Sequence, residues 1–126
     1  MVFQVTGARG TATPVWWNDA TGSMARDDGE SLTYDSAPLK SSLEIIGLPR
    51  VALRASAPVP KANWSVRLED LAPDGQVSLV TGALIQGAER VDRLAPTPLV
   101  PDSLTDLFAE LHFTTWTFRP GHRIRL

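Results

Sequence analysis

Two histidines are the side chains of this sequence best suited to act as general bases near neutral pH, because an unperturbed imidazole titrates there. His112 and His122 each stand in a strand-like context, where a packed or surface histidine is the commoner outcome. A serine nucleophile of the α/β-hydrolase type stands in Gly-x-Ser-x-Gly, a sharp turn that exposes its hydroxyl, and no serine here has glycines at both offsets. Since cysteine is also absent, the sequence predicts no catalytic residue.

Metal and cofactor chemistry finds little support in the residue types. Two histidines ten residues apart, with no cysteine, give no recognisable spacing for zinc or iron. Asp27-Asp28-Gly29-Glu30 supplies the hard oxygen ligands that calcium accepts, although a solvated acidic loop is the favoured interpretation. Gly7-Ala8-Arg9-Gly10 lacks phosphate-loop spacing and is interpreted as a flexible turn. We therefore expect no metal and no cofactor.

Four tryptophans offer a different chemistry, because exposed aromatic rings form contacts with ligands and partner proteins. Trp64 and Trp116 lie in alternating segments and are predicted to pack in the core or between domains. Trp16 and Trp17 are adjacent, so in a strand one of them must point away from the core. Trp16 and Trp17 are therefore the candidate ligand or interface residues.

Composition narrows the function classes further. A chain of 126 residues fits one domain, predicted here over residues 1–126, with a formal net charge of −2. The basic residues are scattered apart from His122-Arg123-Ile124-Arg125, too small a cluster for nucleic-acid binding. No apolar run approaches the roughly 20 residues that span a bilayer, and no leader pattern opens the chain, so we expect no membrane contact and take the cytoplasm as the default location.

The elements that must position these residues are predicted to be short strands, because ten prolines and nine glycines divide the sequence into short apolar segments. Asn63–Asp70 alternates apolar and polar residues, as in a strand buried on one face. The turn formers of Leu71–Gly75 precede a second alternating run, Gln76–Val80, and predict a β-hairpin. Arg50–Ser56 and Thr114–Phe118 are predicted strands as well.

Three segments do not fit a uniform strand pattern. Residues 18–31 are rich in turn formers and predict a surface loop. In Ser103–Phe113 the apolar residues fall at helical spacing, so local pattern alone favours a helix. Residues 83–94 also have a possible helix face, interrupted by Gly87, and both alternatives stay open for them.

From Ser31 onward the segments resemble, in order, the C-terminal domain of the X-prolyl dipeptidyl-peptidase family, which includes cocaine esterase, glutaryl acylases and α-amino-acid ester hydrolases. The resemblance is strongest over residues 31–126 and loose before them. The segments that carry it are Leu32-Thr33-Tyr34-Asp35-Ser36-Ala37-Pro38-Leu39, Leu43-Glu44-Ile45-Ile46-Gly47, Val51-Ala52-Leu53-Arg54-Ala55-Ser56, Val66-Arg67-Leu68-Glu69-Asp70, Pro73-Asp74-Gly75, Leu79-Val80-Thr81-Gly82-Ala83-Leu84 and Phe118-Arg119-Pro120-Gly121-His122-Arg123-Ile124-Arg125-Leu126. The last of these is similar to the family's Phe-x-x-Gly-His-Arg-Ile-Arg-Leu signature.

The resemblance implies an all-β fold, a jelly-roll β-sandwich of the galactose-binding-domain-like type, and it replaces the helix over Ser103–Phe113 with a strand. It also implies a non-catalytic accessory domain, because the family's Ser-Asp-His triad belongs to a preceding α/β-hydrolase domain. His122 would then have a structural role in the Gly121 turn. The family continues past the Arg-Ile-Arg-Leu strand, so we expect the last strands of the sandwich to be missing and a sheet edge to recruit another chain.

Two functions compete at this point. The first is an accessory domain that packs against a catalytic α/β-hydrolase domain outside this chain. The alternative is a free-standing carbohydrate- or peptide-binding module that uses the Trp16–Trp17 region. A broad apolar face would favour the first function, and a groove with aromatic and polar groups would favour the second. The expected partner is therefore a catalytic α/β-hydrolase domain or, in a homo-oligomer, a second copy of the chain joined through sheet edges.

Overall fold

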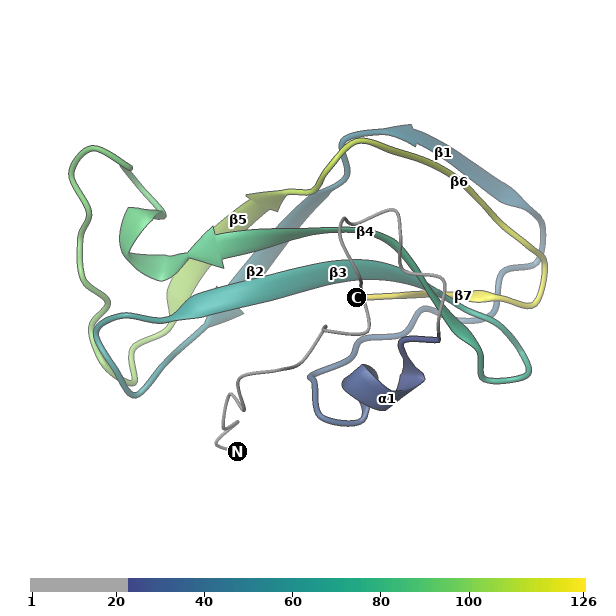
Figure 1. The fold of residues 1–126 in the computed structure, drawn as a ribbon, viewed down its shortest axis with the longest axis horizontal. Coiled ribbons are helices and arrows are strands. Elements are labelled where there is room, and N and C mark those ends of the chain that lie inside the picture. The colour runs from purple at the N-terminus through teal and green to yellow at the C-terminus, as the bar shows by residue number, and fades with distance from the viewer. Residues whose placement is uncertain (1–22) are drawn as a thin grey trace.

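The computed structural model describes residues 23–126, and the candidate residues Trp16 and Trp17 lie outside this range. Almost all of its regular structure is β-strand, as predicted (Figure 1). Its elements are α1 (Ala25–Asp28), β1 (Leu43–Gly47), β2 (Arg50–Ala55), β3 (Asn63–Leu71), β4 (Val77–Gln86), the 3-10 turn η2 (Gly87–Glu89), β5 (Thr105–Glu110), β6 (Thr114–Phe118) and β7 (Arg123–Arg125). No helix in this range is long and apolar enough to span a membrane.

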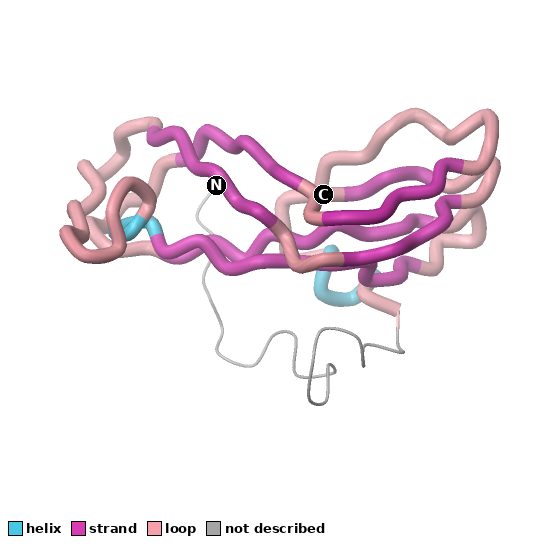
Figure 2. The backbone as a smooth tube through the Cα atoms, turned by 90° about the horizontal axis from the view of Figure 1, so that it is seen from above, coloured by secondary structure: helices cyan, strands magenta, loops and turns pink. Residues whose placement is uncertain are grey.

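The strands form three small antiparallel sheets, which are not closed into a barrel: β1–β6, β2–β5 and β4–β3–β7. The long β3–β4 hairpin confirms the turn predicted over Leu71–Gly75, where Gly75 has the positive φ of 88° that a residue without Cβ adopts easily. Figures 1 and 2 show these sheets as two layers of strands with loops at both ends. The β-sandwich predicted from the resemblance is confirmed.

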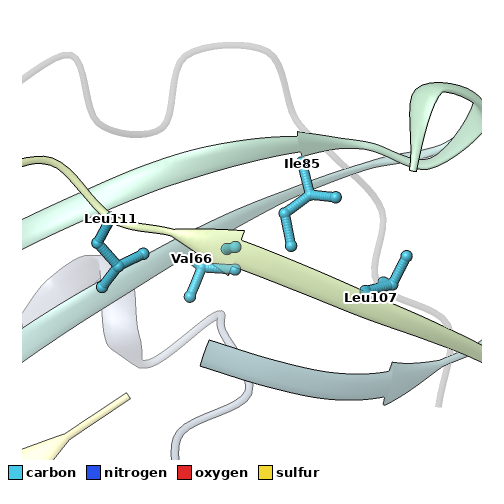
Figure 3. Packing of buried hydrophobic residues seen from close by; sticks show 5 residues of the cluster. Val66, Ile85, Leu107 and Leu111 are labelled. Atoms are coloured by element: carbon cyan, nitrogen blue, oxygen red, sulfur yellow. The ribbon is translucent and has the colours of Figure 1, made fainter. Parts of the chain in front are cut away.

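The main core lies between the β3–β4 hairpin and the β2–β5 ribbon (Figure 3). Its buried members come from β3, from β4 and from the segment 107–111 in and just after β5, where every second residue turns inward. They are Val66, Ile85, Leu107, Ala109 and Leu111. Half-buried Trp64 packs against this cluster, which agrees with the packing role predicted for it.

The local helical pattern of Ser103–Phe113 gives way to strand β5, as the resemblance predicted. β5 pairs with β2 over its whole length, from Arg50 opposite Glu110 to Ala55 opposite Thr105. The partner strand satisfies the backbone polar groups and buries Leu107, and this tertiary pairing overrides the local pattern. The open question over residues 83–94 is also settled, because β4 runs to Gln86 and only one 3-10 turn follows.

The segment predicted as a surface loop, residues 18–31, requires a correction over its described part. Residues 25–28 form the short helix α1, and both Met24, just before the helix, and Asp28, its last residue, are buried. Met24 packs with Val77 and Leu79, while Asp28 is surrounded by arginines from the sheet. The many turn-forming residues of this segment favoured a loop prediction and gave no indication that Met24 and Asp28 are buried.

Candidate functional site

A buried carboxylate holds two of the predicted chemistry-bearing side chains together. Asp70, only 5% exposed, accepts hydrogen bonds from the Trp116 indole Nε1 at 3.0 Å and lies 2.8 Å from the His122 Nδ1. β3 supplies Asp70, β6 supplies Trp116, and the turn before β7 supplies His122. The backbone of this turn has a φ of 82° at Gly121, a conformation that glycine adopts easily because it has no Cβ.

These side chains border a cleft of about 800 Å³, which we call the histidine cleft. Hydroxyls, one guanidinium, two carboxylates and an indole ring line it, so its character is mixed polar and aromatic. The cleft is lined by Asp70, Ala72, Pro73, Asp74, Gln76, Ser78, Thr115, Trp116, Thr117, Arg119 and His122.

The chemistry of the histidine cleft is limited by the lack of an activated nucleophile. An aspartate that orients an imidazole is half of the arrangement that serine hydrolases use. The third member must be a hydroxyl within hydrogen-bond reach of the other imidazole nitrogen. Ser78, Thr115 and Thr117 line the cleft, yet in residues 23–126 none of them forms a hydrogen bond with His122. The arrangement ties three elements together and offers polar contacts to a ligand.

A second group of charges lies on the opposite face of β3, and we call it the acid–arginine cluster. Asp28 of α1, 6% exposed, binds Arg67 through Oδ1 at 2.8 Å and Arg125 through Oδ2 at 2.9 Å. Arg125 also makes a two-pronged contact with Asp35, 2.7 Å from each nitrogen to its oxygen. The fifth member, Glu69, lies 2.7 Å from the Arg67 Nε, a close ion pair without good hydrogen-bond alignment.

Burial, hydrogen bonds and neighbouring charges shift the pKa values of three members of this cluster, and that of Arg125 is raised by its hydrogen bonds to Asp35 and Asp28. Burial raises the pKa of Glu69 to about 7, the nearby Asp28 charge adds to the rise, and Arg67 opposes it. The hydrogen bond from Arg125 lowers the pKa of Asp35 below its ordinary value. The cluster therefore holds residues 28–35 against the sheet through buried ion pairs, at least one of which depends on pH.

The acidic run 27–30, considered for calcium, is used differently. Both carboxylate oxygens of Asp28 are occupied by arginines, whose positive charges would repel a cation. No group of three or more potential ligand side chains capable of holding a metal occurs in the part of the chain that the structure describes.

Sequence reasoning named His122 and Trp116 but missed their shared partner. His112 lies in the β5–β6 connection, where its backbone contacts Gly82 and Thr81 of β4, and it is not part of the histidine cleft. Asp70 could have been predicted from the sequence, because Glu69 and Asp70 are consecutive in a predicted strand. Successive side chains of a strand point to opposite faces, so one of the two carboxylates must point inward.

The comparisons with known proteins place this geometry in a family. Residues 7–126 match the model of the X-Pro dipeptidyl-peptidase C-terminal non-catalytic domain. A Mycobacterium bovis protein named as a serine esterase is 32% identical over 79% of this chain, and this chain spans 18% of it. Cocaine esterase of a Rhodococcus species is 24% identical over 78% of this chain, and the match covers 17% of the length of that esterase.

Solved structures give the same result. An α-amino acid ester hydrolase matches with a TM-score of 0.77 and 30% identity, covering 82% of this chain and 19% of its own. An aminopeptidase from a marine-sediment Thaumarchaeota archaeon matches with a TM-score of 0.78 and 28% identity. The match covers 90% of this chain and 21% of the aminopeptidase. The chain thus spans about a fifth of the length of these relatives. It belongs to the family of X-Pro dipeptidyl-peptidase C-terminal non-catalytic domains.

Proposed function

We propose that this domain packs against the catalytic α/β-hydrolase domain of a serine hydrolase that cleaves esters or X-Pro peptides, and that it stabilises that enzyme without performing chemistry. One observation carries the proposal: residues 7–126 match a domain described as non-catalytic, while the hydrolase relatives are about five times longer. The histidine cleft supports it, because within residues 23–126 no serine or threonine hydroxyl is hydrogen-bonded to the His122 of the Asp70–His122 pair.

A domain exchange tests this function. The matched segment of the Mycobacterium bovis relative is replaced by the whole 126-residue chain, and hydrolysis of a p-nitrophenyl ester is measured alongside thermal stability. We expect the exchanged protein to regain at least half of the activity that the relative loses when the segment is deleted. The relative rejoined to its own segment through the same junctions is the control.

Two results would contradict the proposal. One is an exchanged protein no more active or stable than the truncated relative, while the rejoined control is fully active. The other is labelling of the isolated chain by a fluorophosphonate probe, abolished by His122→Ala, because this would require an activated serine within the chain.

A second candidate function rests on the histidine cleft, which combines an aromatic ring with polar side chains. Such a combination suits a carbohydrate or short peptide, so Trp116 is a candidate contact for this alternative, and Trp16 and Trp17 stay predictions. The test is titration of the isolated chain with mono- and disaccharides and with Gly-Pro peptides, following the Trp116 indole and His122 ring signals by NMR. Saturable shifts that disappear in Trp116→Phe would support it, and unchanged spectra at millimolar ligand would exclude it.

Self-association through sheet edges and a cytoplasmic location stay predictions. In the described residues, β1 and β2 each pair on one side only, so each leaves backbone groups available for another strand. Sedimentation of the isolated chain over a hundredfold concentration range tests whether a second copy uses them.

A further inference from the structure

β1, β2, β5 and β6 form one long two-stranded ribbon with a bend in its middle (Figure 1). Gly47 pairs with Thr114 at the end of one half, and Arg50 pairs with Glu110 at the start of the other. Between them the Leu111 amide donates to the Pro49 carbonyl at 2.8 Å, so pairing continues through the bend. The ribbon therefore presents one outer face along both halves.

Large apolar side chains are exposed along this ribbon. On β5, Leu107 and Ala109 point into the core, while Phe108 between them is 75% exposed. At the bend, Ile46 is 81%, Leu48 51% and Phe113 63% exposed. The β1–β6 register carried one residue past Gly47 brings Leu48 opposite Phe113, with Ile46 two residues away on the same face. We call these four residues the ribbon patch.

The charges around the ribbon patch neutralise one another. Arg50 pairs with Glu110 at 3.0 Å and Arg54 with Asp106 at 2.8 Å, on either side of Phe108 along the ribbon. Opposite Phe108 the register places Ala52, whose small side chain leaves the ring uncovered. An aromatic ring framed by paired charges is the arrangement found at the centre of protein interfaces, where aromatic anchors are enriched and unpaired charges are depleted.

A hollow lies beside the bend and adds to the patch. It has a volume of about 260 Å³, room for an inserted side chain, and its lining is almost wholly apolar. The lining residues are Ile45, Ile46, Gly47, Leu48, Pro49, Leu68, Phe118 and Ile124. An apolar side chain of a partner would fill this hollow while its neighbours cover Leu48.

We propose that the ribbon patch is the surface on which the catalytic domain of the same protein packs. This inference rests on the proposed function and specifies its interface. The relatives, of which this chain spans about a fifth, supply the occupant: a large domain in the same polypeptide, held at high effective concentration. The ribbon patch is apolar, and the charges around it cancel in the pairs Arg50–Glu110 and Arg54–Asp106. The matching surface of the catalytic domain is therefore apolar as well.

Hydroxyl-radical footprinting of side chains tests this interface in the exchanged esterase described above. The reactivity of Phe108 and Phe113 is compared between the isolated chain and the exchanged protein by mass spectrometry. Val91 and Leu94, exposed apolar residues of the loop after η2, serve as internal controls. We expect Phe108 and Phe113 to become at least threefold less reactive, with Val91 and Leu94 changing by less than a factor of 1.5.

Matched variants add a functional readout. Phe108→Ser with Phe113→Ser should leave the melting temperature of the isolated chain within about 3 °C, because both side chains are exposed. In the exchanged protein the same pair should increase proteolytic cleavage at the domain junction at least fivefold. Val91→Ser with Leu94→Ser should change neither measurement.

The outcomes separate this interface from the function on which it rests. An active exchanged protein in which Phe108 and Phe113 stay fully reactive overturns the ribbon patch and leaves the function standing. An exchanged protein no better than the truncated esterase contradicts the function and removes this occupant with it. Concentration-dependent protection of Phe108 in the isolated chain, together with dimer formation, would make a second copy the occupant and also overturn the proposal.

Discussion

The Nδ1 of His122 and the Oδ1 of Asp70 lie 2.8 Å apart although 52 residues separate them in the sequence. The contact joins the turn before β7 to β3, the middle strand of the β4–β3–β7 sheet, and Asp70 is almost fully buried. A buried carboxylate needs its hydrogen-bond donors, because an unsatisfied one carries the full cost of its lost hydration. The pair is therefore a structural tie with a measurable energetic consequence.

Replacing His122 with alanine removes one of the two donors to Asp70 and leaves the carboxylate buried. We expect the free energy of unfolding to fall by about 2 kcal/mol, measured by urea denaturation at pH 7. Thr117→Ala is the matched control, since Thr117 lines the same cleft and is exposed. Equal stability of the two variants would show that the His122 contact contributes nothing.

Glu69 makes the stability of the domain depend on pH. Its pKa is raised from 4.5 in the unfolded chain to about 7 in the folded protein, mainly by burial. Its contribution is therefore fully present below pH 4.5 and is lost as the pH rises through about 7. At 1.36 kcal/mol per pKa unit, the loss across this window is on the order of 3 kcal/mol.

Glu69→Gln removes this titration while keeping the size of the side chain. We expect the variant to gain stability relative to the natural chain as the pH rises from 4.5 to 8, measured by urea denaturation at four pH values. Asp35, whose pKa is lowered, behaves in the opposite sense: its contribution is fully present above its ordinary pKa of 3.8 and is lost only as the pH falls below that value, outside this window. A stability difference between variant and natural chain that is constant across the window would rule out Glu69 as the titrating group.

Arg125 and Arg50 allow buried and exposed ion pairs to be compared in one domain. The Arg125 side chain is largely buried between Asp28 and Asp35, whereas that of Arg50 is largely in solvent beside Glu110. Removing one partner of a buried pair leaves uncompensated charge, while exposed pairs contribute little. We expect Arg125→Met to cost about 3 kcal/mol and Arg50→Met less than about 1 kcal/mol, measured by urea denaturation at pH 7. Similar losses in both variants would contradict a special role of the acid–arginine cluster.

The sequence allowed the strands to be predicted where burial alternates strictly. The structure confirms the predicted strand over Asn63–Asp70 and the hairpin after it. Alternation with a period of two is typical of a strand that has one inner face. In Ser103–Phe113 the same reasoning favoured a helix, since Leu104, Leu107 and Phe108 fall at helical spacing. Only Leu107 of these three is buried, because pairing with β2 decides which residues face the core.

The site residues were less predictable, for a different physical reason. His122 and Trp116 were identifiable as candidates by residue type, but their partner Asp70 is brought to them by β3 pairing with β7. The same holds for Asp28. Its local sequence predicts an exposed side chain, whereas Arg67 of β3 and Arg125 of β7, both distant in the sequence, cover it in the structure. Contacts of this kind depend on strand order and register, which local patterns do not encode.

Gly87 has a packing requirement that tests how tightly the end of the β3–β4 hairpin is filled. A Cβ at this position would lie 2.5 Å from Cζ3 of Trp64 and 2.7 Å from the Ala62 carbonyl oxygen. The Gly87 amide donates a hydrogen bond to that same carbonyl oxygen at 2.9 Å. The backbone at Gly87 therefore cannot move away from Ala62 to make room for a Cβ without breaking this hydrogen bond. We expect Gly87→Ala to lower the free energy of unfolding by about 2 kcal/mol, the usual cost of overpacking.

Gly29→Ala is the matched control for Gly87→Ala. Gly29 has an ordinary helical φ of −58°, and an added Cβ would lie no closer than 3.4 Å to its nearest neighbour, the Arg26 carbonyl oxygen. Alanine there restricts the unfolded chain without crowding the folded one, so its stability should equal or slightly exceed that of the natural chain. Urea denaturation of both variants, followed by tryptophan fluorescence, gives the comparison. If Gly87→Ala is as stable as Gly29→Ala, the contact between Trp64 and the backbone at Gly87 is looser than the structure indicates.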